Sequence, residues 1–232
     1  MPISSPSTPQ IQKTNTFKLL TTTPFKGDTN AICWSRNLEG DFAEIVEKVD
    51  VAEDIVTLGE EELMALELSE QGQLARKTLL NDLKLLQDYG ADPVLNVIRC
   101  YERDDSSLAF PTDVYSYHVD CSPVPTDTIL CTYHGAASDI LPNDQGVQKI
   151  LVPELREKLR ELYGGEEEGF EDFLKENYFD LHYQALPEAR PINLGVGHMW
   201  RLAIDHPESE VLPCLHRAPL EADGKRRLLM IC

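Results

Sequence analysis

The stretch from Tyr115 to Gly135, YSYHVDCSPVPTDTILCTYHG, places a histidine and an aspartate two residues apart. His118 and Asp120 come at the end of an alternating apolar run, which predicts a β-strand. Side chains two apart on a strand leave the same face, so the imidazole and the carboxylate can reach one cation. The alternative is a structural pair that supports a loop, because buried polar groups are usually hydrogen-bonded to each other.

A third candidate ligand is His216 in the segment LPCLHRAP, again after a short apolar run. Two histidines and one carboxylate on a rigid β scaffold form a facial triad, which suits non-haem Fe(II) with open coordination positions. Zinc accepts the same ligands with a water in the fourth place. The sequence therefore predicts a metal site at His118, Asp120 and His216 and leaves the identity of the metal open.

Two arginines follow the second histidine after the turn APLEADGK, at the start of the β-prone run RRLLMIC. If the short strands close into a barrel and this run is a strand antiparallel to its neighbour, an arginine at its start lies inside that barrel beside the metal. A guanidinium there can bind a carboxylate in bidentate fashion. His-x-Asp, a distant histidine and then an arginine is the order found in the Fe(II)/2-oxoglutarate oxygenases.

The resemblance extends over three blocks, YHVDCSPVPTDTILCTYHGAASDILPN, LGVGHMWRLA and LPCLHRAPLEADGKRRLLMI. These are similar to segments of an uncharacterised bacterial family that itself resembles the double-stranded β-helix oxygenases, and the weaker match covers about residues 30 to 232. The resemblance implies Fe(II) held by His118, Asp120 and His216, and 2-oxoglutarate anchored by Arg227. Arg226 is the alternative anchor, because a one-residue slip in register moves a side chain to the other face.

Tyr133, in the Thr-Tyr-x-Gly segment that the resemblance includes, is a further candidate for the cofactor site through its hydroxyl group. The alternative for Tyr133 is an aromatic residue packed in the core. His182, His198 and His206 show no spacing typical of metal ligands, and we expect them to be structural.

The rest of the chain predicts an α+β protein with a jelly-roll, cupin-like core. We expect a disordered segment over residues 1–16, and one domain over 17–232 that is mainly helical to residue 92. Short strands bounded by Pro, Gly, Asp or Asn follow over 93–232, and a charged helical insertion interrupts them at about 150–180. Strands without βαβ alternation favour a sandwich or barrel over a parallel sheet.

The composition excludes several classes of function. The 232 residues carry a formal net charge of −19, which argues against a nucleic-acid-binding face and against docking to an anionic membrane. The proline-rich opening lacks the basic and apolar regions of a signal peptide, and the six cysteines form no Cys-x-x-Cys pair. We therefore expect a cytoplasmic protein whose substrate is a small molecule or a protein.

Three functions are compatible with these residues. The first is an Fe(II)/2-oxoglutarate-dependent dioxygenase that hydroxylates a C–H bond of a second substrate while 2-oxoglutarate is converted to succinate. The second is a zinc-binding, cupin-like protein that acts in hydrolysis or in metal storage and trafficking. The third is a scaffold that has lost its metal. The downstream arginine favours the first, because a zinc hydrolase needs no carboxylate anchor at that position.

Overall fold

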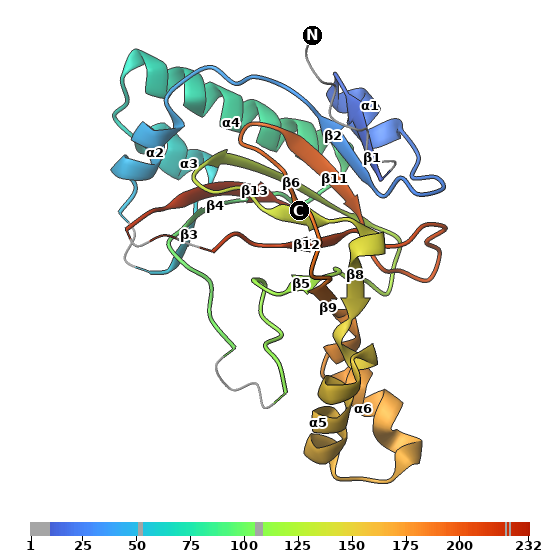
Figure 1. Ribbon diagram of the computed structural model, residues 1–232. Coiled ribbons are helices and arrows are strands. Elements are labelled where there is room, and N and C mark those ends of the chain that lie inside the picture. Colours follow the sequence, from blue (N-terminus) through green and yellow to red (C-terminus); the bar gives the residue numbers. More distant parts are fainter. Residues whose placement is uncertain (1–9, 51–52, 105–108, 221, 223) are drawn as a thin grey trace.

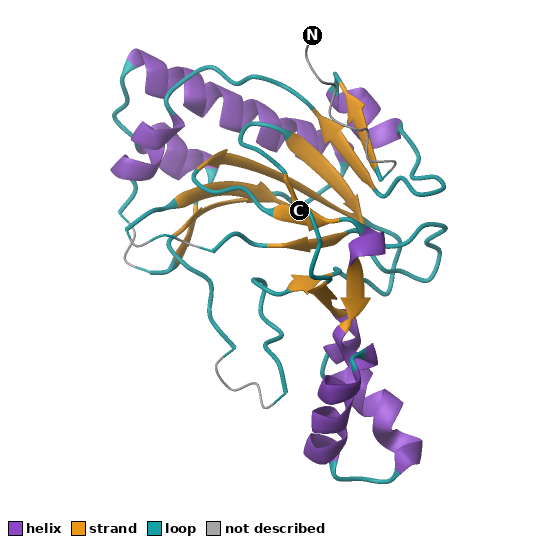
Figure 2. Ribbon diagram, in the orientation of Figure 1, coloured by secondary structure: helices purple, strands orange, loops and turns teal. Residues whose placement is uncertain are grey.

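The computed structural model describes residues 10–50, 53–104, 109–220, 222 and 224–232 (Figure 1). Two β-sheets lie next to each other, helices cover the outer face of the larger sheet, and a helical arm projects from the smaller one (Figure 2). The chain is thus an α+β protein, as the sequence predicts. Across the described part of the chain, none of the helices combines the length and the apolar character that a bilayer crossing requires.

The larger sheet has seven strands, all antiparallel to their neighbours except the first pair, β1 and β2. In spatial order they are β1 (Ile11–Thr14), β2 (Ala31–Trp34), β11 (Met199–Ala203), β6 (Asp127–His134), β13 (Arg227–Ile231), β4 (Val94–Ile98) and β3 (Ile55–Thr57). Strand β1 lies within the segment that the sequence predicts to be disordered. It is ordered by parallel pairing with β2, a tertiary contact that local composition does not reveal. Residues 1–9 of that segment lie outside the described residues.

The smaller sheet has six strands and is antiparallel throughout. In spatial order they are β10 (Ile192–Asn193), β7 (Asp139–Leu141), β12 (Leu215–Arg217), β5 (Tyr117–His118), β9 (His182–Ala185) and β8 (Gly146–Gln148). The strands are short, and several are separated by Pro- or Gly-containing loops, which explains why sequence patterns detect only some of them.

The helices on the outer face of the larger sheet are α1 (Phe17–Thr22), α2 (Phe42–Lys48), α3 (Glu60–Ala65) and α4 (Glu70–Tyr89). Helix α4, of 20 residues, lies in the part of the chain that the sequence predicts to be mainly helical. Ser69 caps its N-terminus by accepting a hydrogen bond from the Gly72 backbone N–H, and Gly90 ends it with a left-handed backbone at φ +96°. Its buried residues Leu79 and Leu86 pack in the core between the helices and the sheet.

Alternation along the strands divides the apolar residues between two cores. On β13, Leu228 and Met230 join the core under the helices, whereas Leu229 joins a second core with Ile140 of the smaller sheet. This second core fills the space between the two sheets. Alternation therefore assigns each residue of a strand either to the helix-covered side or to the space between the sheets. This assignment decides on which side each predicted site residue lies.

The arm is inserted between β8 and β9, where the sequence predicts a helical insertion (Figure 1). It contains α5 (Pro153–Tyr163) and α6 (Phe170–Glu176), and short 3₁₀ helices occur in and around it: η1 (Asn143–Gln145), η2 (Lys149–Leu151), η3 (Glu167–Gly169) and η4 (Phe179–Leu181). The arm has its own apolar cluster, which includes Phe110, Leu159 and Phe170. The arm is thus a packed element with a small core of its own.

Candidate metal centre

The structure brings the three predicted metal ligands together. His118 ends β5, and His216 lies directly opposite it on the neighbouring antiparallel strand β12, so the two side chains share one face of the sheet. Their ring centroids are 4.5 Å apart. Asp120 follows two residues after His118 and points to the same place. One ligand atom from each of the three lies within 4.8 Å of the other two, and among the described residues this is the group that could hold a metal ion.

Both histidine nitrogens lie close to the Asp120 carboxylate. Nε2 of His118 lies 3.8 Å from Oδ1 of Asp120, and Nε2 of His216 lies 3.5 Å from Oδ2 of the same carboxylate. Metal bonds to nitrogen and oxygen are about 2.0–2.2 Å long, which separates neighbouring ligand atoms by roughly 3 to 3.5 Å. Each histidine nitrogen is thus less than about 1 Å from such a separation to the carboxylate, and all three ligand atoms lie within 4.8 Å of one another.

Backbone carbonyl groups fix the tautomers of both histidines. Nδ1 of His118 lies 2.8 Å from the Ser116 carbonyl oxygen, and Nδ1 of His216 lies 3.3 Å from that of Cys214. A carbonyl oxygen can only accept a hydrogen bond, so each ring carries its hydrogen on Nδ1. The lone pair is then on Nε2, the atom that faces Asp120. Histidine ligands of metals are usually oriented in this way by a partner on the other ring nitrogen.

The carboxylate is held by a residue of the opposite sheet. Thr128, at the start of β6, donates a hydrogen bond of 2.5 Å from Oγ1 to Oδ2 of Asp120. The Asp120 carbonyl oxygen also accepts a hydrogen bond from the Asp205 backbone N–H. Thr128 is buried and orients the carboxylate toward the histidines. Sequence reasoning did not identify it, because only the packing of the two sheets brings β6 to this point.

Burial keeps two histidines of this region uncharged. Burial, reinforced by the neighbouring His216, lowers the pKa of His118 from its ordinary value to about 4. Burial also lowers the pKa of His182 to about 3, with His118 and Lys149 acting in the same direction. Near neutral pH, His118 therefore offers a free lone pair, as a metal ligand must.

His182 also lies in this region, although the sequence predicts only a structural role for it. It lies on β9 directly opposite His118, so His216, His118 and His182 form a row across three neighbouring strands. Its ring centroid is 5.9 Å from that of His118, and its side chain is buried. No spacing in the sequence indicates this row, because it arises from strand pairing across the arm.

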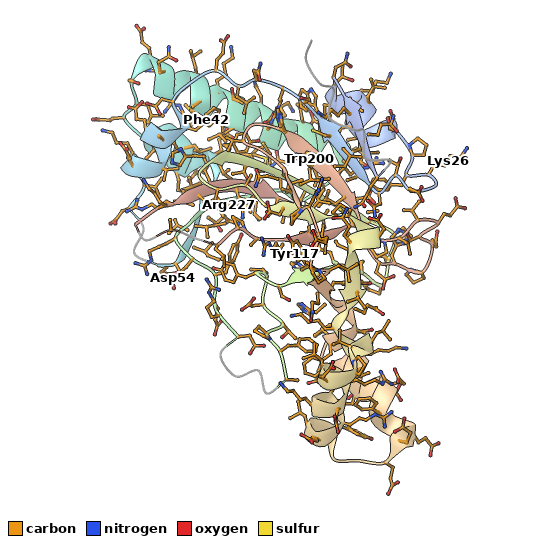
Figure 3. The ribbon with its side chains drawn as sticks, viewed as in Figure 1. Lys26, Phe42, Asp54, Tyr117, Trp200 and Arg227 are labelled. Carbon is orange, nitrogen blue, oxygen red and sulfur yellow. The ribbon has the colours of Figure 1, made fainter. Side chains whose placement is uncertain are left out.

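The two candidate arginines lie on opposite faces of the larger sheet. Arg227, labelled in Figure 3, is buried between the sheets, where its Nη2 donates to Oγ1 of Thr132 at 3.0 Å and to Oγ of Ser138 at 2.8 Å. Arg226 donates from Nη1 to the carbonyl oxygens of Val46 and Val49, both at 3.1 Å, at the end of α2. Only Arg227 of the pair thus faces the space that contains the triad.

Tyr133 lies on the helix-covered face of β6, opposite to the expectation that it binds a cofactor. Its hydroxyl group donates to Oδ2 of Asp82 at 2.6 Å, and its ring stacks on Phe42 at a centroid distance of 5.5 Å. Asp82, on α4, is almost fully buried and also accepts two hydrogen bonds from the Arg36 guanidinium. Because side chains alternate along a strand, Thr132 faces the triad side and Tyr133 cannot.

None of the protein-family models, curated proteins or solved structures with which the chain was compared matches it. The chemical interpretation of the centre therefore depends on the side chains and strand order described above.

Proposed function

We propose that the chain is an Fe(II)/2-oxoglutarate-type oxygenase with a double-stranded β-helix core, which hydroxylates a small molecule or a protein. The observation that carries this proposal is that Arg227 and the triad of His118, Asp120 and His216 face the same space between the sheets. A facial triad with a buried guanidinium nearby is the arrangement that a metal-bound dicarboxylate requires.

The order of the strands supports the proposed fold. Consecutive strands alternate between the two sheets: β4 and β6 are in the larger sheet, and β5 and β7 are in the smaller one. After the arm, β10 and β12 are in the smaller sheet, and β11 and β13 are in the larger one. Such alternation between two antiparallel sheets, with neighbours that are distant in sequence, is typical of a jelly roll. The arm and strands β1, β2, β3, β8 and β9 would be additions to this core.

The separation of the two ends of the site supports a five-carbon dicarboxylate as co-substrate. Thr128 contacts Asp120 and Thr132 contacts Arg227, and these threonines are four residues apart on β6, or about 13 Å. The carbon chain of 2-oxoglutarate spans about 5 Å. A metal bond of about 2 Å and a hydrogen bond of about 3 Å extend this to about 10 Å. The 13 Å joins the backbone positions of the two threonines, and the ligands and the guanidinium lie beyond their side chains, so the two lengths are of the same order.

Each residue has a definite part in this proposal. Fe(II), 2-oxoglutarate and O2, when bound, would supply oxidative decarboxylation of 2-oxoglutarate to succinate and CO2, coupled to insertion of the second oxygen atom into a C–H bond. His118, Asp120 and His216 would hold three positions on one side of the ion and leave the others open. Arg227 would bind the far carboxylate in bidentate fashion. Leu130, between the two ends on the same face of β6, would keep water from this space.

A zinc-binding, cupin-like protein is the alternative that the same three ligands allow, because zinc binds such sites more tightly than Fe(II). The nearby cysteines do not strengthen this alternative, because none of them belongs to the group of described residues whose ligand atoms lie close enough together to hold a metal ion. The buried Arg227 has no function in a simple zinc site.

The test uses the two neighbouring arginines as a matched pair. Anaerobic calorimetry would measure 2-oxoglutarate binding to the Fe(II)-loaded protein, and mass spectrometry would measure succinate after oxygen is admitted. We expect Arg227→Gln to weaken 2-oxoglutarate binding about 100-fold, as for loss of a buried charged hydrogen bond. Arg226→Gln should bind it like the wild type. Tight zinc binding without 2-oxoglutarate binding would support the alternative, and equal binding by both variants would refute the role of Arg227.

A further inference from the structure

Both ends of the arm reach His118. Lys149 lies in η2, before the arm helices begin, and His182 lies on β9, where the chain returns from them. The His182 ring lies on one side of His118 at 5.9 Å, and the His216 ring lies at 4.5 Å. The position of the His118 ring is therefore limited on one side by the first residue of the strand to which the arm returns.

Lys149 reaches His118 through one intermediate residue. Its Nζ donates a hydrogen bond of 2.6 Å to Oγ of Ser116, and the Ser116 carbonyl oxygen accepts the 2.8 Å hydrogen bond from Nδ1 of His118. The Lys149 Nζ also donates to the Pro111 carbonyl oxygen at 3.3 Å and lies 4.6 Å from the centre of the Phe110 ring. All of these contacts hold the segment that leads into the ligand.

The charge of Lys149 is not used in an ion pair. Although the chain has 40 acidic residues, none that the structure describes forms an ion pair with Lys149, and Asp113 acts on it only at longer range. A partly buried ammonium group that hydrogen-bonds to uncharged oxygens is costly for stability. Such a cost is typical of sites where geometry matters for function.

We propose that Lys149 is a positioning residue for the metal ligand His118 and acts through Ser116, so that the arm helps to set the metal affinity. This inference rests on the proposed metal centre. The Lys149 hydrogen bond fixes the Ser116 side chain and its peptide group, and the Ser116 carbonyl fixes the His118 ring. The hydrogen bond to Nδ1 also increases the basicity of Nε2, the ligand atom.

The test is a double-mutant cycle on the full chain with Co(II) as the probe. Lys149→Met, Ser116→Ala and the double variant would be compared by Co(II) affinity and by the visible d–d spectrum, which reports ligand geometry. We expect each single variant to bind Co(II) about 10- to 100-fold more weakly, with an altered spectrum, as for loss of an outer-shell partner. The double variant should bind Co(II) no more weakly than the single variant with the lower affinity, because both changes break the same path. Lys149→Arg should bind Co(II) more tightly than Lys149→Met.

Lys158→Met is the matched control, because Lys158 is an exposed residue of α5 on the same arm. It should bind Co(II) like the wild type. The inference is overturned if Lys149→Met keeps the wild-type affinity and spectrum, if the two single losses multiply, or if Lys158→Met loses as much. If Lys149→Met does not fold, Ser116→Ala alone must still show the loss. A wild-type protein that binds no Co(II) would refute the proposed metal centre itself, and this inference with it.

Discussion

The lowered pKa values of His118 and His182 predict that the metal-free protein loses stability in mild acid. The folded-state pKa values of His118 and His182, about 4 and about 3, lie below the usual value of 6.5. Between pH 6.5 and 4 the unfolded chain therefore binds protons at these positions that the folded chain does not. Since the unfolded state binds more protons, the free energy of unfolding falls as the pH falls through this window.

The size of the effect follows from the same shifts. Between pH 6.5 and 5, each histidine should remove roughly 1.5 kcal/mol from the free energy of unfolding, so the pair removes roughly 3 kcal/mol. Carboxylates titrate mainly at lower pH, so this interval isolates the histidines. Urea denaturation of the chelator-treated protein at the two pH values measures the change directly.

The control for this prediction is His182→Phe, which keeps a ring in the row but removes one titrating group. Its loss of stability between pH 6.5 and 5 should be about half that of the wild type. A free energy of unfolding that does not change over this interval would refute the inference that both histidines are neutral in the folded chain. The inference would also be refuted if His182→Phe lost as much stability as the wild type between pH 6.5 and 5.

Three further predictions concern other residues around the sheets. Tyr133→Phe should lower the free energy of unfolding by about 1 to 2 kcal/mol in urea denaturation, because Asp82 loses a buried hydrogen bond. It should leave metal affinity unchanged, and a loss of metal or 2-oxoglutarate binding would show that Tyr133 belongs to the site. Asp82→Ala should cost about 3 to 5 kcal/mol in the same assay, because it leaves the Arg36 guanidinium without its buried partner, and a cost below about 1 kcal/mol would contradict this. Thr128→Val should weaken metal binding about 10-fold in calorimetry, because Asp120 loses the hydroxyl group that orients it, and an unchanged affinity would show that Thr128 does not hold the ligand.

The sequence predicts best where a local rule is sufficient. The spacing of His118 and Asp120 requires both to face one way on an extended chain, and the structure has them so. Helix α4 begins after a capping serine and ends at a glycine, and both signals are local. The β-prone run RRLLMIC also correctly indicated β13, because strongly β-prone residues there need no distant partner to be recognised.

The sequence predicts less where strand register decides the outcome. Arg226 and Arg227 are neighbours with the same chemistry, and only pairing of β13 with β4 and β6 determines which one faces the space between the sheets. Tyr133 belongs to a motif that suggests the site, yet alternation along β6 turns it toward Asp82. His182 joins the histidine row because β9 returns from the arm to pair with β5, and no local pattern carries that information.

The central claim is that His118, Asp120 and His216 hold one metal ion. The most direct measurement is anaerobic Fe(II) titration of the chelator-treated protein, followed by metal analysis after gel filtration, for the wild type and for His118→Ala. The structure predicts one Fe(II) per chain in the wild type and loss of binding in the variant. A wild-type protein that retains no metal, or a His118→Ala variant that retains as much as the wild type, would contradict the account.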